Sequence, residues 1–271
     1  LGFTREDQEV FERNAQMPDG IMLVTGPTGS GKTTTLYSCL NLLNTPNKKI
    51  ITVEDPVEYI LGGINQVQVN ILAGMTFAAA LRAMLRQGPH IIMVGEIRDQ
   101  ETGTIAVNAS LTGHFVFSTL HTNDAPGAVS RLIDMGIKPF LVAAATRAVL
   151  AQRLVRKFCK KCETTHTLTE GEMKALELTH EDIKDASTLI GMGCKACDGG
   201  GYKGRLGLFE VLEFEDELKR LIIKGESSAT LREFALEKGI MKTLRQDGVN
   251  KVLSGRTSVA EVVRVTVSDE A

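Results

Sequence analysis

Short apolar runs alternate with helical patterns along the first 150 residues of this 271-residue chain. Four runs consist almost entirely of aliphatic and aromatic residues, and this composition predicts strands that are buried on both faces of a parallel sheet. They are "IMLVT" (21–25), "IITV" (50–53), "IIMV" (91–94) and "FVFST" (115–119). Between two of them, Phe77, Leu81 and Met84 form an apolar stripe that predicts a helix, with Thr76 as its cap. Repeated strand and helix patterns predict a doubly wound α/β domain.

The pattern changes after residue 155. Residues 156–204 are rich in cysteine, lysine and glycine, and the stretch 168–178 predicts a helix. Further helices are predicted at 215–224, 229–238 and 240–253. We therefore expect an α/β core over 1–155, a cysteine-bearing subdomain over 156–204 and a mainly helical C-terminal subdomain over 205–271.

The segment "GPTGSGKT" (26–33) follows the first predicted strand and opens a helix carrying Leu36 and Leu40. It fits the phosphate-binding pattern G-x-x-x-x-G-K-[ST], in which backbone amides surround phosphate oxygens, the lysine reaches the β- and γ-phosphates and the last hydroxyl binds Mg²⁺. A chance glycine-rich turn lacks this strand and helix context. The predicted nucleotide-binding residues are Gly26, Pro27, Thr28, Gly29, Ser30, Gly31, Lys32, Thr33 and Thr34.

Acidic residues follow two of the predicted strands. Glu54, Asp55 and Glu58 come after the strand 50–53, and Glu96 comes after the strand 91–94. A solvated turn before a proline is the alternative for the first group. Because the carboxyl ends of parallel strands meet at one edge of a sheet, we expect both groups to face the phosphate loop.

Four motifs occur in order: "GPTGSGKTTTLY", "VEDPVEY", "MVGEIRDQETG" and "TGHFVFSTLHTNDA". They resemble the Walker A, Asp-box, Walker B and His-box motifs of the type II secretion and type IV pilus assembly ATPase family, over nearly the whole chain. The resemblance implies a RecA-like P-loop NTPase core, ATP hydrolysis, Mg²⁺, a homohexameric ring, and work on an inner-membrane assembly platform with cytoplasmic adaptor proteins.

The same resemblance assigns roles to single residues. Glu96 matches the Walker B glutamate, associated with Mg²⁺ and its waters, and Glu54 and Glu58 match Asp-box acids, with Glu54 the candidate for activating water. His114 and His121 match the His-box pair, and His121 is the better placed to sense the γ-phosphate. The predicted catalytic residues are Glu54, Glu58, Glu96 and His121. Arg98 and Asp99, which follow Walker B, are expected to position other groups or to contact a neighbouring subunit.

Four of the five cysteines form two C-x-x-C pairs, and Cys39 stands alone. Four thiolates at this spacing suit a closed tetrahedral Zn²⁺ site, and such a metal is structural. A redox pair or inert thiols are the alternatives. The resemblance supports zinc, because assembly ATPases of this family carry a tetracysteine element at this place. The predicted ligands are Cys159, Cys162, Cys194 and Cys197.

Basic residues without an acid among them surround the first cysteine pair. A solvated face and an interface with anionic lipid or a neighbouring subunit are both compatible with them. They are Arg147, Arg153, Arg156, Lys157, Lys160 and Lys161.

Arginines that neutralise charge on the γ-phosphate come, in the resembled family, largely from a domain before the core. Only 20 residues precede Ile21, so we expect that the N-terminal domains of the full-length protein are absent. Slow hydrolysis and weak hexamer formation would follow, unless Arg82, Arg98 or Arg131 supplies the charge from within.

Composition narrows the function classes. A net charge of −2, three tyrosines and no tryptophan argue against a nucleic-acid partner, so a RecA-like nucleic-acid motor is the weaker alternative. A nucleotide-binding scaffold without catalysis is a third possibility, against which the intact motifs argue. No apolar run reaches the length of a membrane span, and we expect a cytoplasmic protein that reaches the inner membrane through its partners.

Overall fold

The computed structural model describes residues 1–266, and these residues form two compact units. The first, called the P-loop unit here, contains residues 4–151 and 211–241. The second, called the cysteine unit, contains residues 1–3, 152–210 and the described part of the chain after residue 241. Residues 267–271, at the end of the predicted C-terminal subdomain, lie outside the described residues.

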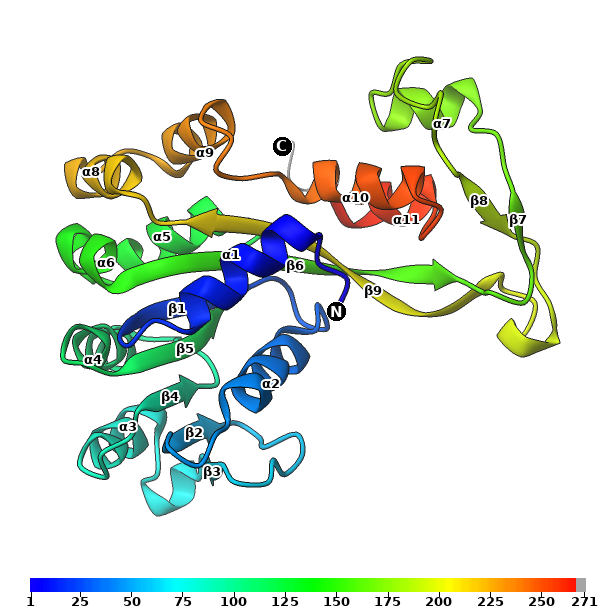
Figure 1. Ribbon diagram of the computed structural model, residues 1–271. Helices are drawn as coiled ribbons and strands as arrows, with labels where there is room; N and C mark the ends of the chain where they lie inside the picture. The colour runs from blue at the N-terminus through cyan, green and yellow to red at the C-terminus, as the bar shows by residue number, and fades with distance from the viewer. Residues whose placement is uncertain (267–271) are drawn as a thin grey trace. The chain divides into compact units, whose positions relative to one another are not determined.

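A twisted sheet forms the centre of the P-loop unit (Figure 1). Its strand order is β3-β2-β4-β5-β1-β6-β9, and every pairing from β3 to β6 is parallel. The strands are β1 (Gly20–Thr25), β2 (Ile50–Glu54), β3 (Asn65–Gln68), β4 (Ile91–Val94), β5 (Phe115–Leu120), β6 (Thr146–Phe158) and β9 (Tyr202–Glu213). Strands β6 and β9 have residues in both units.

The register of the parallel strands decides where their ends lie. Val24 of β1 is opposite Thr119 of β5, and Val94 of β4 is opposite Ser118. On the other side of β4, Val53 of β2 is opposite Val94. The loops that follow β1, β2, β4 and β5 therefore leave the sheet at the same edge, as expected of a doubly wound fold.

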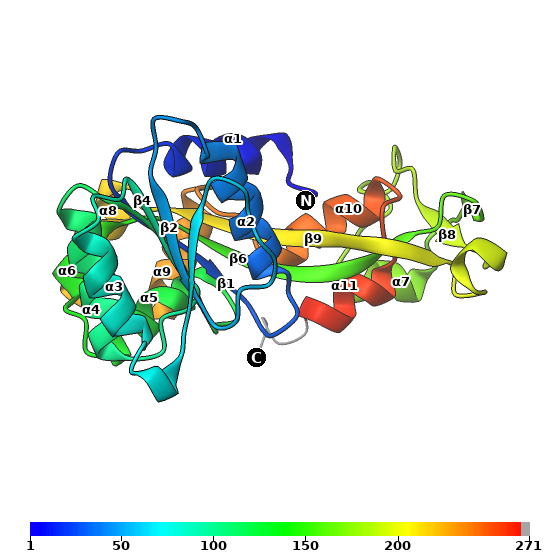
Figure 2. The same ribbon diagram turned by 90° about the horizontal axis from the view of Figure 1, so that it is seen from below.

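Helices cover both faces of this sheet. Figure 2 shows α1 (Arg5–Ala15) and α2 (Lys32–Leu43) on one face, and α3 (Phe77–Leu85), α4 (Gln100–Leu111) and α5 (Ala125–Asp134) on the other. The remaining helices of the unit are α6 (Pro139–Ala145), α8 (Asp216–Lys224), α9 (Ser228–Glu237) and the short 3₁₀ turn η1 (Ile71–Ala73). Covered faces explain why all residues of β1, β2, β4 and β5 are buried.

The cysteine unit combines short strands with helices. Strands β7 (Glu163–Thr165) and β8 (Leu189–Gly191) pair antiparallel. The helices are α7 (Glu170–Ala175), α10 (Leu244–Leu253), α11 (Val259–Thr266) and the 3₁₀ turn η2 (Lys195–Cys197). Buried aliphatic side chains of α7, α10 and α11, including Met173, Val252 and Val262, form its apolar core.

The structure confirms the predicted α/β fold with its parallel sheet, and each predicted strand lies within one or two residues of an observed one. The helix after Thr76 is present, and the Oγ1 of Thr76 accepts a hydrogen bond from the amide of Ala79 at 3.2 Å. The compact units differ from the three predicted regions, because α8 and α9 belong to the P-loop unit whereas α10 and α11 belong to the cysteine unit.

Candidate active site and metal centre

The phosphate loop connects β1 to α2 through Gly26–Gly31 of the P-loop unit. Gly26, Gly29 and Gly31 have φ values of 146°, 78° and 89°, which L-residues with side chains rarely adopt. The ammonium group of Lys32 donates to the carbonyl oxygens of Gly26 at 2.7 Å and Pro27 at 3.1 Å. Gly31 occupies the N-cap of α2 without a side chain, so the first-turn amides face the loop as an anion site.

Glu96 follows β4 and is brought together with His121, which follows β5. The Glu96 side chain is 14% exposed, and its Oε2 lies 3.4 Å from Nε2 of His121. Its other oxygen pairs with the guanidinium of Arg98, and this bond raises the pKa of Arg98. The structure thus places two of the predicted catalytic residues in contact at the edge where the phosphate loop lies.

Threonine side chains attach the loop containing His121 to β1. The amide of Thr122 donates to Oγ1 of Thr25 at 2.8 Å, and the two hydroxyl oxygens are 2.7 Å apart. Asp124 caps α5 by accepting from the amide of Gly127 at 2.7 Å and pairs with Arg232 at 3.0 Å. Because Thr25 directly precedes Gly26, these bonds hold the segment 121–124 beside the phosphate loop.

The Asp-box residues differ in exposure. Glu54 is the last residue of β2 and only 3% exposed, whereas Asp55 and Glu58 are exposed. The carboxylate of Glu54 accepts hydrogen bonds from Tyr37 of α2, from Thr52 and from Gln66 of β3. Sequence reasoning missed both Tyr37 and Gln66. Tyr37 lies within the quoted Walker A segment but was given no role, and no strand was predicted around Gln66.

Two residues named from the motifs lie elsewhere or have another role. His114 precedes β5, its Nδ1 lies 3.1 Å from the carbonyl of Ala109, and its own carbonyl accepts from the amide of Gly20 at the start of β1. It therefore lies at the opposite end of these six-residue strands from the phosphate loop, about 20 Å away. Asp99 caps α4, since its carboxylate accepts from the amide of Thr102 at 2.8 Å.

The basic residues near the first cysteine pair are partly neutralised inside their own units. Arg147 pairs with Asp19 at 2.5 Å in the P-loop unit. In the cysteine unit, Arg156 pairs with Glu261 at 2.9 Å and Lys160 pairs with Glu163 at 3.0 Å. Asp19 and Glu261 are distant in sequence from the arginines they pair with, and Glu163 comes after the last of the basic residues. The sequence pattern therefore showed only the positive charges.

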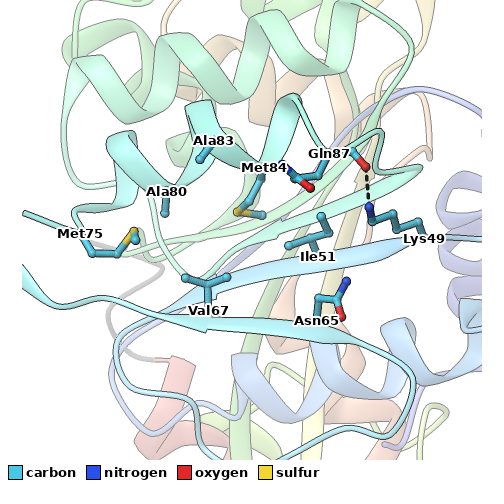
Figure 3. A pocket seen from close by; sticks show the side chains of 9 residues that line it. All are labelled: Lys49, Ile51, Asn65, Val67, Met75, Ala80, Ala83, Met84 and Gln87. Atoms are coloured by element: carbon cyan, nitrogen blue, oxygen red, sulfur yellow. Dashed lines mark hydrogen bonds between the residues drawn. The ribbon is translucent and has the colours of Figure 1, made fainter.

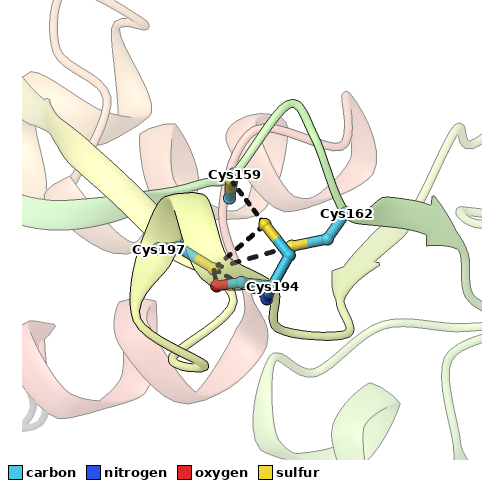
Figure 4. A group of neighbouring side chains, drawn as sticks. All are labelled: Cys159, Cys162, Cys194 and Cys197. Atoms are coloured by element: carbon cyan, nitrogen blue, oxygen red, sulfur yellow. Dashed lines mark hydrogen bonds between the residues drawn. The ribbon is translucent and has the colours of Figure 1, made fainter.

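The four predicted metal ligands converge in the cysteine unit, and Figure 4 shows their side chains pointing toward one another. All four Sγ atoms lie within 4.8 Å of one another. The Sγ atoms are 4.0 Å apart for Cys159 and Cys194, 3.7 Å for Cys162 and Cys197, and 3.8 Å for Cys194 and Cys197. Four sulfurs around a tetrahedral zinc with bonds of about 2.3 Å would lie about 3.8 Å apart, so the cluster fits Zn²⁺.

Backbone groups favour the thiolate of Cys197 in this cluster. The amides of Cys194 and Gly201 donate to Sγ of Cys197 at 3.2 Å and 3.3 Å. The hydrogen bond from the Cys194 amide, together with that from Gly201, lowers the pKa of Cys197 to about 7. Burial acts in the opposite direction on Cys162 and raises the pKa of its thiol to about 12. Metal ligands must be deprotonated, so the backbone hydrogen bonds suit Cys197 itself to metal binding, and the case for the other three cysteines rests on the sulfur separations.

Glycines allow the chain to cross itself beside the cluster. A Cβ at Gly191 would lie 2.0 Å from the carbonyl oxygen of Gly201, and one at Gly193 would lie 2.4 Å from that of Gly199. No side chain fits these two crossings. The glycine-rich sequence around Cys194 and Cys197 is therefore a steric requirement of the cysteine site.

A separate cavity of about 250 Å³ opens between α3 and strands β2 and β3 (Figure 3). Ile51, Val67 and Met84 line it with aliphatic surface, and Nζ of Lys49 donates to the carbonyl of Gln87 at 2.5 Å beside it. The residues around it include none of the predicted catalytic, nucleotide-binding or metal-binding residues. It is a gap in packing between a helix and the sheet, distinct from the candidate active site.

A parallel sheet with a phosphate loop after its first strand, and acidic residues after two others, defines the class of P-loop nucleotide-binding proteins. A more specific assignment comes from sequence comparison. The family model described as "Type II/IV secretion system protein" matches residues 1–264, and the chain belongs to this family.

Curated relatives agree with the family. The chain is 50% identical over 267 residues to a type IV pilus assembly ATPase PilB from Thermus thermophilus, covering 98% of this chain and 30% of that protein. It is also 50% identical over 267 residues to a type II secretion system protein E from Pseudomonas aeruginosa, covering 98% of this chain and 52% of that protein. The chain thus spans between about a third and a half of these two relatives.

Solved structures support the fold. A crystal structure of the pilus retraction motor PilT with bound ADP matches with a TM-score of 0.71 at 26% identity, covering 98% of this chain and 65% of that one. The ATPase DotB of Legionella pneumophila, at 23% identity, matches with a TM-score of 0.71 over 96% of this chain and 63% of that one, and shows the same fold. Among residues 1–266, no helix is both long and apolar enough to cross a membrane.

Proposed function

We propose that this chain is the ATP-hydrolysing region of a motor that powers assembly of a type IV pilus or a type II secretion pseudopilus at the bacterial inner membrane. One observation carries the proposal: the phosphate loop, the Glu96–His121 contact and Glu54 lie at one edge of the parallel sheet. The names of the curated relatives, a pilus assembly ATPase and a secretion protein E, supply the two candidate machines.

Each group at this edge has chemistry suited to ATP and Mg²⁺. Lys32 and the amides of the phosphate loop are suited to hold phosphate oxygens, and the hydroxyl of Thr33 is suited to bind Mg²⁺. We assign Glu96 to the waters around Mg²⁺, and we assign His121, which contacts Glu96, to respond to the γ-phosphate. Glu54 and Glu58 form a second acidic group on the adjacent strand end.

Partners follow from the same assignment. We propose that the protein works as a homohexamer on the cytoplasmic side, together with an inner-membrane assembly platform and cytoplasmic adaptor proteins. A structural Zn²⁺ held by Cys159, Cys162, Cys194 and Cys197 is part of the proposal, supported by the sulfur separations above.

Substitution of the Walker B glutamate tests the proposed activity. We expect Glu96→Gln to lower the ATP hydrolysis rate about a hundredfold or more, because it removes the negative charge beside the metal and its waters. ATP affinity should remain within a few-fold, measured by equilibrium binding. Glu101→Gln is the matched control, since Glu101 is an exposed acid of α4 and pairs only at the surface with Arg82.

Two results would overturn the proposal. One is a chain that binds no ATP in the presence of Mg²⁺. The other is an unchanged hydrolysis rate in the Glu96→Gln variant. Stimulation of hydrolysis by single-stranded DNA would instead favour the nucleic-acid motor.

A further inference from the structure

A buried hydrogen-bond network joins three elements of the P-loop unit. Tyr37 of α2 is 1% exposed, and its hydroxyl donates to Oε2 of Glu54 at the end of β2. Thr52 donates to Oε1 of the same carboxylate at 2.6 Å, and Nε2 of Gln66 donates to that oxygen at 3.1 Å. Both oxygens of Glu54 therefore accept hydrogen bonds from protein side chains.

The sheet register explains why these side chains meet. Thr52 and Glu54 are two residues apart on β2, so they lie on the same face of the sheet. Gln66 of β3 is opposite Thr52, and Gln68 is opposite Glu54. Tyr37, on α2, which covers one face of the sheet, reaches this group, and α2 begins at Lys32 of the phosphate loop.

The same side chains hold the backbone of the segment 55–61, which carries Glu58. The hydroxyl oxygen of Tyr37 accepts from the amide of Glu58 at 3.3 Å. Gln66 accepts from the amide of Leu61 at 2.7 Å through Oε1 and donates to the carbonyl of Tyr59 at 3.2 Å through Nε2. This segment has no regular helix or strand, so these contacts contribute strongly to its conformation.

We propose that Tyr37, Glu54 and Gln66 are positioning residues, which fix the segment 55–61 so that Glu58 presents its carboxylate to the bound nucleotide. This inference rests on the proposed ATPase function and refines its assignment of the Asp-box acids. Glu54 is buried and accepts from three donors, and a general base needs a lone pair within reach of the attacking water. Glu58 is exposed, and its backbone is attached through Tyr37 to the helix that begins at the phosphate loop.

Two variants of the full chain test this role in steady-state ATP hydrolysis. Tyr37→Phe removes the hydroxyl that connects Glu54 to the Glu58 amide, and Gln66→Ala removes the contacts to Tyr59 and Leu61. We expect each to lower kcat between about tenfold and a hundredfold while the KM for ATP stays within about twofold, because misplacement affects the reacting geometry more than phosphate binding. Tyr59→Phe is the matched control, since the rings of Tyr37 and Tyr59 meet in a T-shaped arrangement and phenylalanine retains the ring.

Hydrogen exchange of single backbone amides gives a readout that does not depend on activity. Tyr37→Phe should speed exchange at the amide of Glu58, and Gln66→Ala should speed exchange at the amide of Leu61. Tyr59→Phe should change neither rate.

The hydrolysis and hydrogen-exchange measurements together distinguish failure of the proposed function from failure of the positioning inference. If the wild-type chain does not hydrolyse ATP, the proposed function fails, whereas the exchange rates still show whether the network orders the segment. If wild-type hydrolysis is robust but both variants keep their kcat, the positioning inference is overturned. It is also overturned if Glu54→Gln abolishes turnover while Tyr37→Phe and Gln66→Ala leave it near the wild-type rate, because Glu54 would then act as the base itself.

Discussion

The two units of this protein organise their functional groups by different means. In the P-loop unit, sheet register and loop hydrogen bonds bring Glu54, Glu96 and His121 to one edge, and protein groups already pair with each of them. In the cysteine unit, four sulfurs converge from two sequence segments and face one another within 4.8 Å. The scaffold alone can organise the first site, whereas the second has the donor set of a metal that contributes to folding.

Loss of a cysteine ligand should have the largest effect. We expect Cys197→Ser to abolish stoichiometric zinc binding and to unfold residues 159–201, because structural zinc supplies roughly 10 kcal/mol or more of folding free energy in small domains. Elemental analysis and hydrogen exchange measure the two effects, and ATP affinity of the P-loop unit should change less than about twofold.

Cys39→Ala is the matched control for this variant. Cys39 is buried in α2, where burial raises the pKa of its thiol to about 12, and it lies outside the four-sulfur cluster. Its variant should keep the zinc. If wild-type protein purified without chelator holds almost no zinc, the cysteine unit is not a zinc site, and the contrast between the two units no longer holds.

In the P-loop unit, Lys32→Ala should reduce activity without unfolding the protein, which is the opposite of the effect expected for loss of a cysteine ligand. Loss of the ammonium should reduce ATP hydrolysis about a hundredfold or more. The free energy of unfolding should change by less than about 1 kcal/mol, since the ammonium of Lys32 donates to carbonyl oxygens of the partly exposed phosphate loop rather than to groups of the core. Lys49→Ala is the control, because Lys49 also donates to a backbone carbonyl and lies away from the phosphate loop. Unfolding of the Lys32→Ala variant would show that this site, too, is needed for the fold.

A buried carboxylate gives the cysteine unit a second, pH-dependent source of stability. Burial alone would raise the pKa of Glu261, but hydrogen bonds from Arg264 and Arg156 outweigh it and lower this pKa to about 2, from 4.5. Because the folded pKa is the lower one, the stabilisation is complete above pH 4.5 and disappears as the pH falls toward 2.

Glu261→Gln should therefore destabilise the cysteine unit by about 2 kcal/mol at pH 7, and the difference from wild type should vanish between pH 4.5 and 2. Denaturant unfolding over this range measures it, and comparing the two proteins cancels acid release of zinc. Glu181→Gln, at an exposed ion pair with Lys184, should show no such pH-dependent gap. If the difference in unfolding free energy between the two proteins did not change with pH, the charge of Glu261 would contribute nothing to stability.

The smallest effect is expected at a surface ion pair. Arg82 and Glu101 are 2.5 Å apart with about half of each side chain exposed, so Arg82→Ala should change the free energy of unfolding by about 0.5 kcal/mol or less. Turnover should stay within about twofold of wild type. A hundredfold loss of turnover would identify Arg82 as an internal source of positive charge for the γ-phosphate.

Among the strands, sequence patterns predicted those whose environment is uniform along their length. Strands β1, β2, β4 and β5 are buried throughout, so their residues are apolar and easily recognised. The two longest strands, β6 and β9, were missed. β6 contains Gln152 and Arg153, both buried, and these polar residues interrupt its apolar pattern. β9 contains glycine, and a Cβ at Gly207 would lie 2.3 Å from the ring of Phe209.

Chemistry carried by neighbouring residues was determined by the sequence itself. The phosphate loop and each C-x-x-C pair are local, because their spacing already sets which groups can face one ligand. Contacts between distant residues were decided only by the tertiary structure. Parallel register placed Gln66 beside Thr52 and α2 brought Tyr37 to Glu54, while folding joined Cys159 to Cys194 and Arg156 to Glu261. Such pairs depend on which strands and helices become neighbours, and local residue patterns do not encode that choice.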